Sequence, residues 1–101
     1  MADSWLHLWP DLPNDPKWRT IARVSKQPIS TVIAVYLHVL VDASDNVSAP
    51  GRLQSFRAED VASSLDITDE DVAAVLEAMQ GRVLDGDRLT FWEKHMGDFD
   101  A

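Results

Sequence analysis

Residues 57–92, RAEDVASSLDITDEDVAAVLEAMQGRVLDGDRLTFW, contain the pattern that decides the fold. Apolar residues recur at helical spacing on both sides of a two-residue turn, Asp66 and Ile67, so two consecutive helices are expected. The inner face of the first, short helix consists of Val61, Ala62 and Leu65. Thr68 caps the second, longer helix, whose inner face consists of Val72, Val75, Leu76 and Met79.

The segment after these helices contains a helix stop and a hairpin. Gly81 stands where a left-handed C-terminal cap belongs. In VLDGDRLTFW, residues 83–92, two apolar runs flank Asp85 and Gly86, a pair that tolerates the positive backbone angles of a tight turn. The whole stretch therefore predicts a helix-turn-helix followed by a β-hairpin wing.

The preceding residues supply a strand and two more helices. SWLHLW, residues 4–9, alternates with the period of two that is typical of a short strand. NDPKWRTIARVS, residues 14–25, begins a helix, with Asn14 or Asp15 as the cap and Pro16 at the first helical position. PISTVIAVYLHVLVDAS, residues 28–44, is apolar almost all round and is therefore expected to be the central buried helix.

A loop at residues 45–52 and a short strand at RLQSF, residues 52–56, complete the order of elements. The predicted fold is mainly α with a small β part: strand, two helices, short strand, helix-turn-helix and β-hairpin wing, which is a winged helix-turn-helix. At 101 residues the chain fits one domain, expected over residues 1–95, with residues 96–101 as a flexible tail.

Composition favours a cytoplasmic location without a membrane segment. The chain has no cysteine, which excludes disulfides and thiolate metal sites. The longest apolar run, residues 31–41, is too short to span a bilayer.

Charge is unevenly distributed along the sequence. Seventeen acidic and nine basic residues give a net charge of −8, which opposes simple DNA binding. Residues 17–26 nevertheless hold four bases and no acid, whereas residues 59–77 hold seven acids and no base. The domain is therefore expected to be dipolar.

The bases are the candidate DNA contacts, through weak and non-specific binding to phosphates. The candidates are Lys17, Arg19, Arg23 and Lys26 of the basic helix, with Arg82 and Arg88 beside the hairpin. The alternative is that the first four form a solvated helix face paired with the surplus acids. Asp85 and Asp87 cancel the charge of the wing arginines.

The acids and two tryptophans are the candidate protein contacts. Asp69, Glu70 and Asp71 oppose the positive end of the helix dipole and would repel a duplex from the helix that usually reads DNA. Together with Glu77 they are candidates for a protein-docking face. Trp5 and Trp9 lie on a strand whose open edge suits a partner or a second copy, so a homo-oligomer is possible.

The sequence contains no pattern typical of metal binding or catalysis. Residues 66–77 place acids like a calcium loop, but Asp71 stands where that loop needs glycine. His7, His38 and His95 lack metal-ligand spacing, and no nucleophile or phosphate-loop motif is present. We therefore expect no enzymatic activity, no cofactor, no metal and no small-molecule substrate.

Several of these stretches resemble the N-terminal winged-helix domain of phage and prophage replication proteins, of the DnaD/DnaT-like primosomal type. The resemblance covers about residues 4–95 and is carried by the strand before NDPKW and the hairpin before WEK. The matching residues are Trp5, Asp15, Pro16, Lys17, Gly81, Gly86, Trp92, Glu93 and Lys94. In this family a basic extension usually follows WEK, whereas here HMGDFDA follows.

The resemblance implies a module that helps to assemble a replication complex on phage DNA, through contacts with DNA, with replication proteins of phage or host, or both. Two alternatives remain. One is an acidic interaction or self-association module that never touches DNA, and the other is a winged-helix transcriptional regulator.

Overall fold

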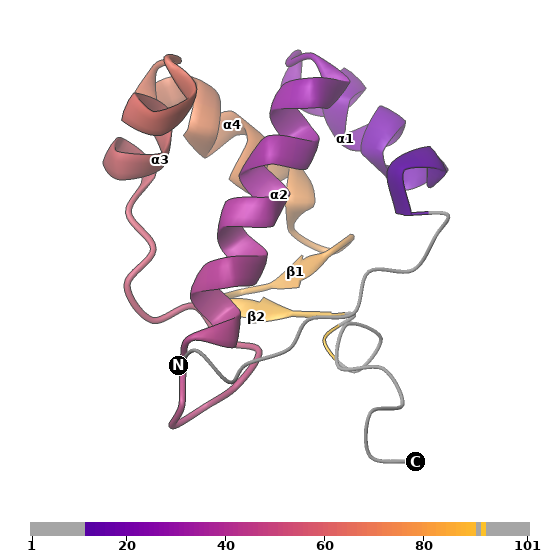
Figure 1. Ribbon diagram of the computed structural model, residues 1–101. Helices are drawn as coiled ribbons and strands as arrows, with labels where there is room; N and C mark the ends of the chain where they lie inside the picture. Colours follow the sequence, from indigo (N-terminus) through magenta and orange to yellow (C-terminus); the bar gives the residue numbers. More distant parts are fainter. Residues whose placement is uncertain (1–11, 91, 93–101) are drawn as a thin grey trace.

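The structure, a computed structural model, describes residues 12–90 and residue 92. Its elements, in chain order, are η1 (Leu12–Asn14), α1 (Pro16–Ser25), α2 (Ile29–Ser44), α3 (Ala58–Leu65), α4 (Asp69–Met79), β1 (Leu84–Asp85) and β2 (Arg88–Leu89) (Figure 1). The prediction of a mainly α fold with a small β part is thereby confirmed. The strand predicted at residues 4–9 and the tail at residues 96–101 lie outside the described residues.

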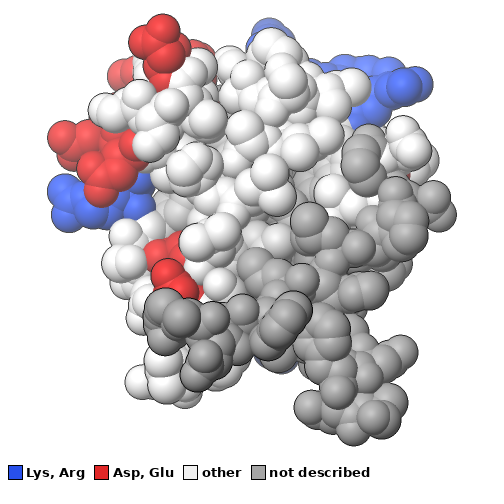
Figure 2. Space-filling model, in the orientation of Figure 1, with Lys and Arg blue, Asp and Glu red and all other residues white. Residues whose placement is uncertain are grey.

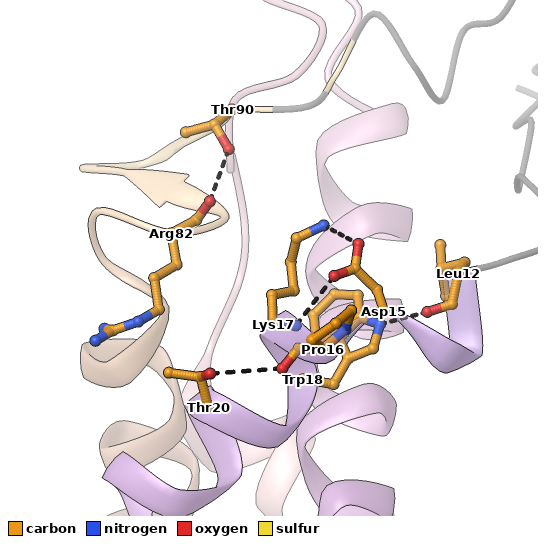
Figure 3. Close-up of polar contacts among 8 residues, drawn as sticks. All are labelled: Leu12, Asp15, Pro16, Lys17, Trp18, Thr20, Arg82 and Thr90. Carbon is orange, nitrogen blue, oxygen red and sulfur yellow. Dashed lines mark hydrogen bonds and ion pairs between the residues drawn. The ribbon is translucent and has the colours of Figure 1, made fainter.

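Helix α1 begins as the sequence indicates. The Asp15 carboxylate accepts a hydrogen bond from the backbone N–H of Lys17 at 3.0 Å, and Pro16 occupies the first turn. Trp18 and Ile21 are buried, and the Trp18 indole N–H donates to the Leu12 carbonyl at 2.6 Å. The start of α1 is therefore held by the preceding 3-10 turn as well as by its own cap (Figure 3).

Helix α2 is the centre of the core, with α1, α3, α4 and β2 packed around it. Its buried side chains are Val32, Val35, Tyr36, Val39, Leu40 and Ala43. The predicted central helix therefore forms the core, but one side of it faces solvent, because Leu37 is 40% and Val41 is 53% exposed. Figure 1 shows α2 in front of α4, with α3 and α1 on opposite sides of it.

The predicted helix-turn-helix corresponds to α3, a turn at Asp66 and Ile67, and α4. Asp66 takes the left-handed conformation, with φ of 60°. The Thr68 hydroxyl accepts from the backbone N–H of Asp71 at 3.0 Å, and the Asp71 carboxylate accepts from the backbone N–H of Thr68 at 3.3 Å. This reciprocal pair is a capping box built on the predicted cap, Thr68.

The end of α4 differs in detail from the prediction. Met79 is its last residue, and Gln80 is extended, with φ of −63° and ψ of 132°. Gly81 has the expected positive φ, 80°, but the Arg82 N–H donates to the Met79 carbonyl at 2.9 Å. These angles define a type II turn, which needs glycine at its third position, so Gly81 serves a turn and not a left-handed helix cap.

The hairpin pairs Leu84 with Leu89 and Asp85 with Arg88 in antiparallel register. The two loop residues are therefore Gly86 and residue 87, one position later than the sequence suggested. Gly86 has φ of 65°. The second loop residue, Asp87, does not have a positive φ. A hairpin turn in which only the first loop residue has a positive φ is one that favours glycine at that position.

The strand predicted at residues 52–56 is wrong in extent. Arg52 forms a single antiparallel bridge with Arg88, supported by a hydrogen bond from the Leu53 N–H to the Asp87 carbonyl at 2.8 Å. Beyond Leu53, the backbone N–H groups of residues 54 and 55 donate to the Asp42 carboxylate. Because these donors face a side chain instead of a strand, the ladder ends there.

Within the described ranges, no single helix is long and apolar enough to cross a membrane. Helices α1 and α2 satisfy that criterion only when taken together, and the chain bends by 105° between them.

Candidate DNA-binding and partner-binding surfaces

The bases of α1 form an exposed surface, which we term the α1 basic face: Arg19, Arg23 and Lys26. The first two lie one helical turn apart, and Lys26 ends the helix in a left-handed conformation. Of the ion pairs found among residues 12–90 and 92, none involves these three side chains. Figure 2 shows this positive charge gathered on the α1 side of the molecule.

Lys17 is placed differently from the rest of the predicted basic stripe. Its ammonium group pairs with the Asp15 carboxylate and lies 5.6 Å from the centre of the Trp18 ring. Its side chain is only 21% exposed. Lys17 therefore neutralises the carboxylate that caps α1, as Figure 3 shows.

The two predicted wing arginines have separate roles. The Arg82 guanidinium donates to the Ala78 carbonyl at 2.8 Å, where a cation stabilises the C-terminal end of α4. The Arg82 carbonyl accepts from the Thr90 hydroxyl at 3.3 Å, which ties this turn to the end of the hairpin (Figure 3). Arg88 is exposed on β2.

Arg52 is a third arginine of the wing that the sequence did not reveal. Its guanidinium pairs with the Asp87 carboxylate at 2.8 Å, across 35 positions of chain. Three arginines, Arg52, Arg82 and Arg88, stand against two acids, Asp85 and Asp87, so the wing has a net charge of +1. Long-range contacts between residues 51–53 and the hairpin bring the group together, so no local sequence signal could have found it.

The solvent side of α4 has no basic residue. Its exposed residues are Asp69, Glu70, Ala73 and Glu77, followed by Gln80. Asp71 is half-buried and accepts from the Gln27 amide at 3.0 Å as well as from its capping partner. The Asp71 carboxylate is therefore used within the fold, whereas its neighbours Asp69 and Glu70 are exposed to solvent.

Acids of α3 extend this negative surface, which we term the acidic edge: Glu59, Asp60, Asp66, Asp69 and Glu70. Arg57 lies 3.7 Å from the carboxylates of both Glu59 and Asp60, so it screens one end of the edge. Exposed pairs at this distance contribute little stability. Figure 2 shows negative charge on the α3 side, opposite the positive charge of α1.

Helix α1 packs along the side of α4 that faces away from α3. A shallow groove of about 340 Å³ between α1 and α4 is lined by Val24, Ser25, Ala74, Glu77, Ala78 and Arg82. A duplex that approached α4 would therefore meet α1 and the Glu77 carboxylate together.

Of the remaining predicted residues, Trp5, Trp9, His7 and His95 lie outside the described part of the chain. His38 is half-buried in a hollow beside α2. In the described segments no three His, Asp or Glu side chains are arranged to hold a metal ion. Residues 69–77, the end of the calcium-like pattern, belong to α4 and so do not form a loop.

Comparison with protein-family models, with curated proteins and with solved structures finds no match for this chain. Its function is therefore inferred from its own surfaces.

Proposed function

We propose that the chain is a non-enzymatic winged-helix module of the phage or prophage replication type. In this proposal it binds DNA weakly through the α1 basic face and keeps α4 away from the duplex. The order α2, Arg52 bridge, α3, α4 and hairpin supports a winged helix, with α1 as an addition. One observation carries the functional part: three exposed bases without an ion pair lie together on and directly after α1, while the solvent side of α4 carries only acidic and neutral residues.

The expected DNA contact is electrostatic. Three phosphate contacts would give a slope of about −2.7 for the logarithm of affinity against the logarithm of salt concentration. Raising the salt from about 50 to about 200 mM would then weaken binding roughly fortyfold. With a net charge of −8 the domain repels DNA elsewhere, so binding should be weak and indifferent to base sequence.

The test compares two charge reversals, Arg19→Glu and Arg57→Glu. Both replace an exposed arginine on a helix or at its start, and both lower the net charge by the same amount. Anisotropy of labelled duplex and single-stranded DNA is measured at about 50 mM salt. Arg19→Glu should reduce binding at least tenfold, whereas Arg57→Glu, on the acidic edge, should change it less than twofold.

Two outcomes would contradict the proposal. Equal losses in both variants would mean that only net charge matters and that α1 is not an interface. Tight, sequence-specific binding that survives Arg19→Glu would favour a transcriptional regulator instead.

A protein-interaction module without DNA is the second candidate, and the acidic edge favours it. Five exposed acids gather there on α3, α4 and the turn between them. Such a surface suits a basic protein partner, for example a replication protein of phage or host. Absence of DNA binding by the parent at low salt would leave this candidate.

The non-enzymatic part of the proposal is supported by how two acids that line the hollow beside α2 are used. Asp42 accepts from the backbone N–H groups of Gln54 and Ser55 and from the Ser55 hydroxyl at 2.8 Å. Asp60 lies beside the Arg57 guanidinium. These carboxylates are engaged by neighbouring donors and are poorly placed for acid-base catalysis.

A further inference from the structure

The solvent side of α2 carries an apolar row, of which Ile33 packs partly against the core. Its members, Ile29, Ile33, Leu37 and Val41, follow one another at intervals of four residues, and we term them the α2 ridge. Ile29 is 38%, Leu37 is 40% and Val41 is 53% exposed, while Ile33 is half-buried. Such spacing places them in one row about 18 Å long.

The ridge lies between two surfaces of opposite charge. Helix α2 itself has one charged residue, Asp42, so the face it presents is nearly neutral. The α1 basic face lies on one side of this helix and the acidic edge on the other, as Figures 1 and 2 show from the same direction. An apolar row with opposite charges on its two flanks is a self-complementary pattern.

We propose that the α2 ridge binds the α2 ridge of a second copy of this chain, with the two helices parallel. A two-fold axis parallel to α2 places the α1 side of each copy opposite the α3 side of the other, so positive charge meets negative charge. A two-fold axis across α2 places α1 beside α1 and α3 beside α3, so like charges meet. The charge pattern therefore selects the parallel arrangement.

A hollow beside the ridge can accommodate a side chain of the second copy. Its volume is about 400 Å³, and Leu37, Val41 and Phe56 form an apolar part of its lining. The charged residues of the lining are Asp42, Asp45, Arg57 and Asp60. An apolar side chain of the second copy that entered this hollow would lose contact with water and gain packing. The ridge is short, however, so the dimer should be of the weak and reversible class.

Two valines provide a matched test, because Val41 on the ridge and Val24 on α1 are both 53% exposed and both helical. Sedimentation is followed from about 10 µM to about 1 mM protein, a range suited to weak dimers. Val41→Glu should weaken dimerisation at least tenfold, since it introduces a charge into an apolar contact. Val24→Glu should change it less than threefold, and circular dichroism checks that both variants fold.

Cysteine cross-linking tests the orientation, and the chain has no native cysteine to interfere. In Ile29→Cys and Val41→Cys, a short bifunctional thiol reagent should join each cysteine to its own equivalent in the second copy, because parallel helices keep equal positions level. An antiparallel pair would separate equal positions at the ends of the ridge by up to about 18 Å. Cross-linking only in a mixture of the two variants would overturn the parallel arrangement.

Other results would overturn the proposal altogether. A parent that remains monomeric at about 1 mM has no such dimer. Equal weakening by Val24→Glu and Val41→Glu would place the contact elsewhere. A monomeric parent that binds a basic amphipathic peptide in a Val41-dependent manner would assign the ridge to a foreign helix.

Discussion

Replacing Gly51 with alanine should destabilise the domain strongly, for two separable reasons. Gly51 has φ of +93°, which an alanine adopts only with strain. A Cβ at this position would also lie 2.8 Å from Cγ of the Trp92 ring and 3.0 Å from Cδ1. The backbone cannot easily move away, because the Gly51 N–H donates to the Ala43 carbonyl and its carbonyl accepts from the Leu89 N–H.

The magnitude follows from these two effects. Left-handed strain costs about 1–2 kcal/mol, and forcing an atom into a packed contact costs about 1–3 kcal/mol. A loss of about 3 kcal/mol in the free energy of unfolding corresponds to a fall of roughly 12–24 °C in Tm for a domain of this size. Thermal unfolding followed by far-ultraviolet circular dichroism would measure it.

Gly86 is the matched control, since its φ is +65° but a Cβ there meets no atom within 4 Å. Gly86→Ala should therefore cost only the strain, about 1–2 kcal/mol. Trp92→Leu should also reduce the cost of Gly51→Ala, because the two changes are coupled through one contact. Equal losses for the two glycine variants, without coupling to Trp92, would refute the idea that the indole packs on Gly51.

Two further predictions concern a cap and a buried phenol. Thr68→Ala should lower the free energy of unfolding by about 1 kcal/mol, because the capping box is lost. Thr20→Ala, at an exposed site inside α1, should leave the free energy of unfolding unchanged or slightly higher. Urea unfolding would measure both variants. Burial raises the pKa of Tyr36 above the usual range of a phenol, so the unfolded state releases this proton first. The stability that depends on the neutral phenol is present below about pH 10 and is lost as the pH rises above it. Tyr36→Phe should reduce this alkaline loss in urea unfolding, and an identical loss in both proteins would contradict the prediction.

Local sequence signals predicted the helices well. Asp15 with Pro16, and Thr68 with Asp71, identify where α1 and α4 begin because a capping side chain and its backbone donor lie within three residues. The type II turn at Gly81 cannot be distinguished from a helix cap by sequence, since several turn and cap geometries share a positive φ.

Features that depend on distant residues could not be predicted in this way. The bridge at Arg52 exists because the hairpin lies against it, and the ladder ends because the Asp42 carboxylate takes the next backbone donors. Lys17 has the right helical spacing for the basic face, but its cation pairs with the capping carboxylate of Asp15 two residues earlier. Helical spacing specifies the side of the helix on which a residue lies, whereas the ion pair of a flexible side chain depends on which charged groups lie within its reach.

The acids at the start of α4 explain why a DNA contact would lie elsewhere on the molecule. Asp71 satisfies the backbone of Thr68 and also accepts from the Gln27 side chain, which lies between Lys26 and Pro28. A base at this position would lose the capping box and leave the Gln27 amide without this acceptor, so stability favours an acid. The same hydrogen bond fixes the turn after α1 against the beginning of α4. The Asp71 carboxylate, which adds negative charge to the first turn of α4, thus also links that turn to the residue that follows the α1 basic face.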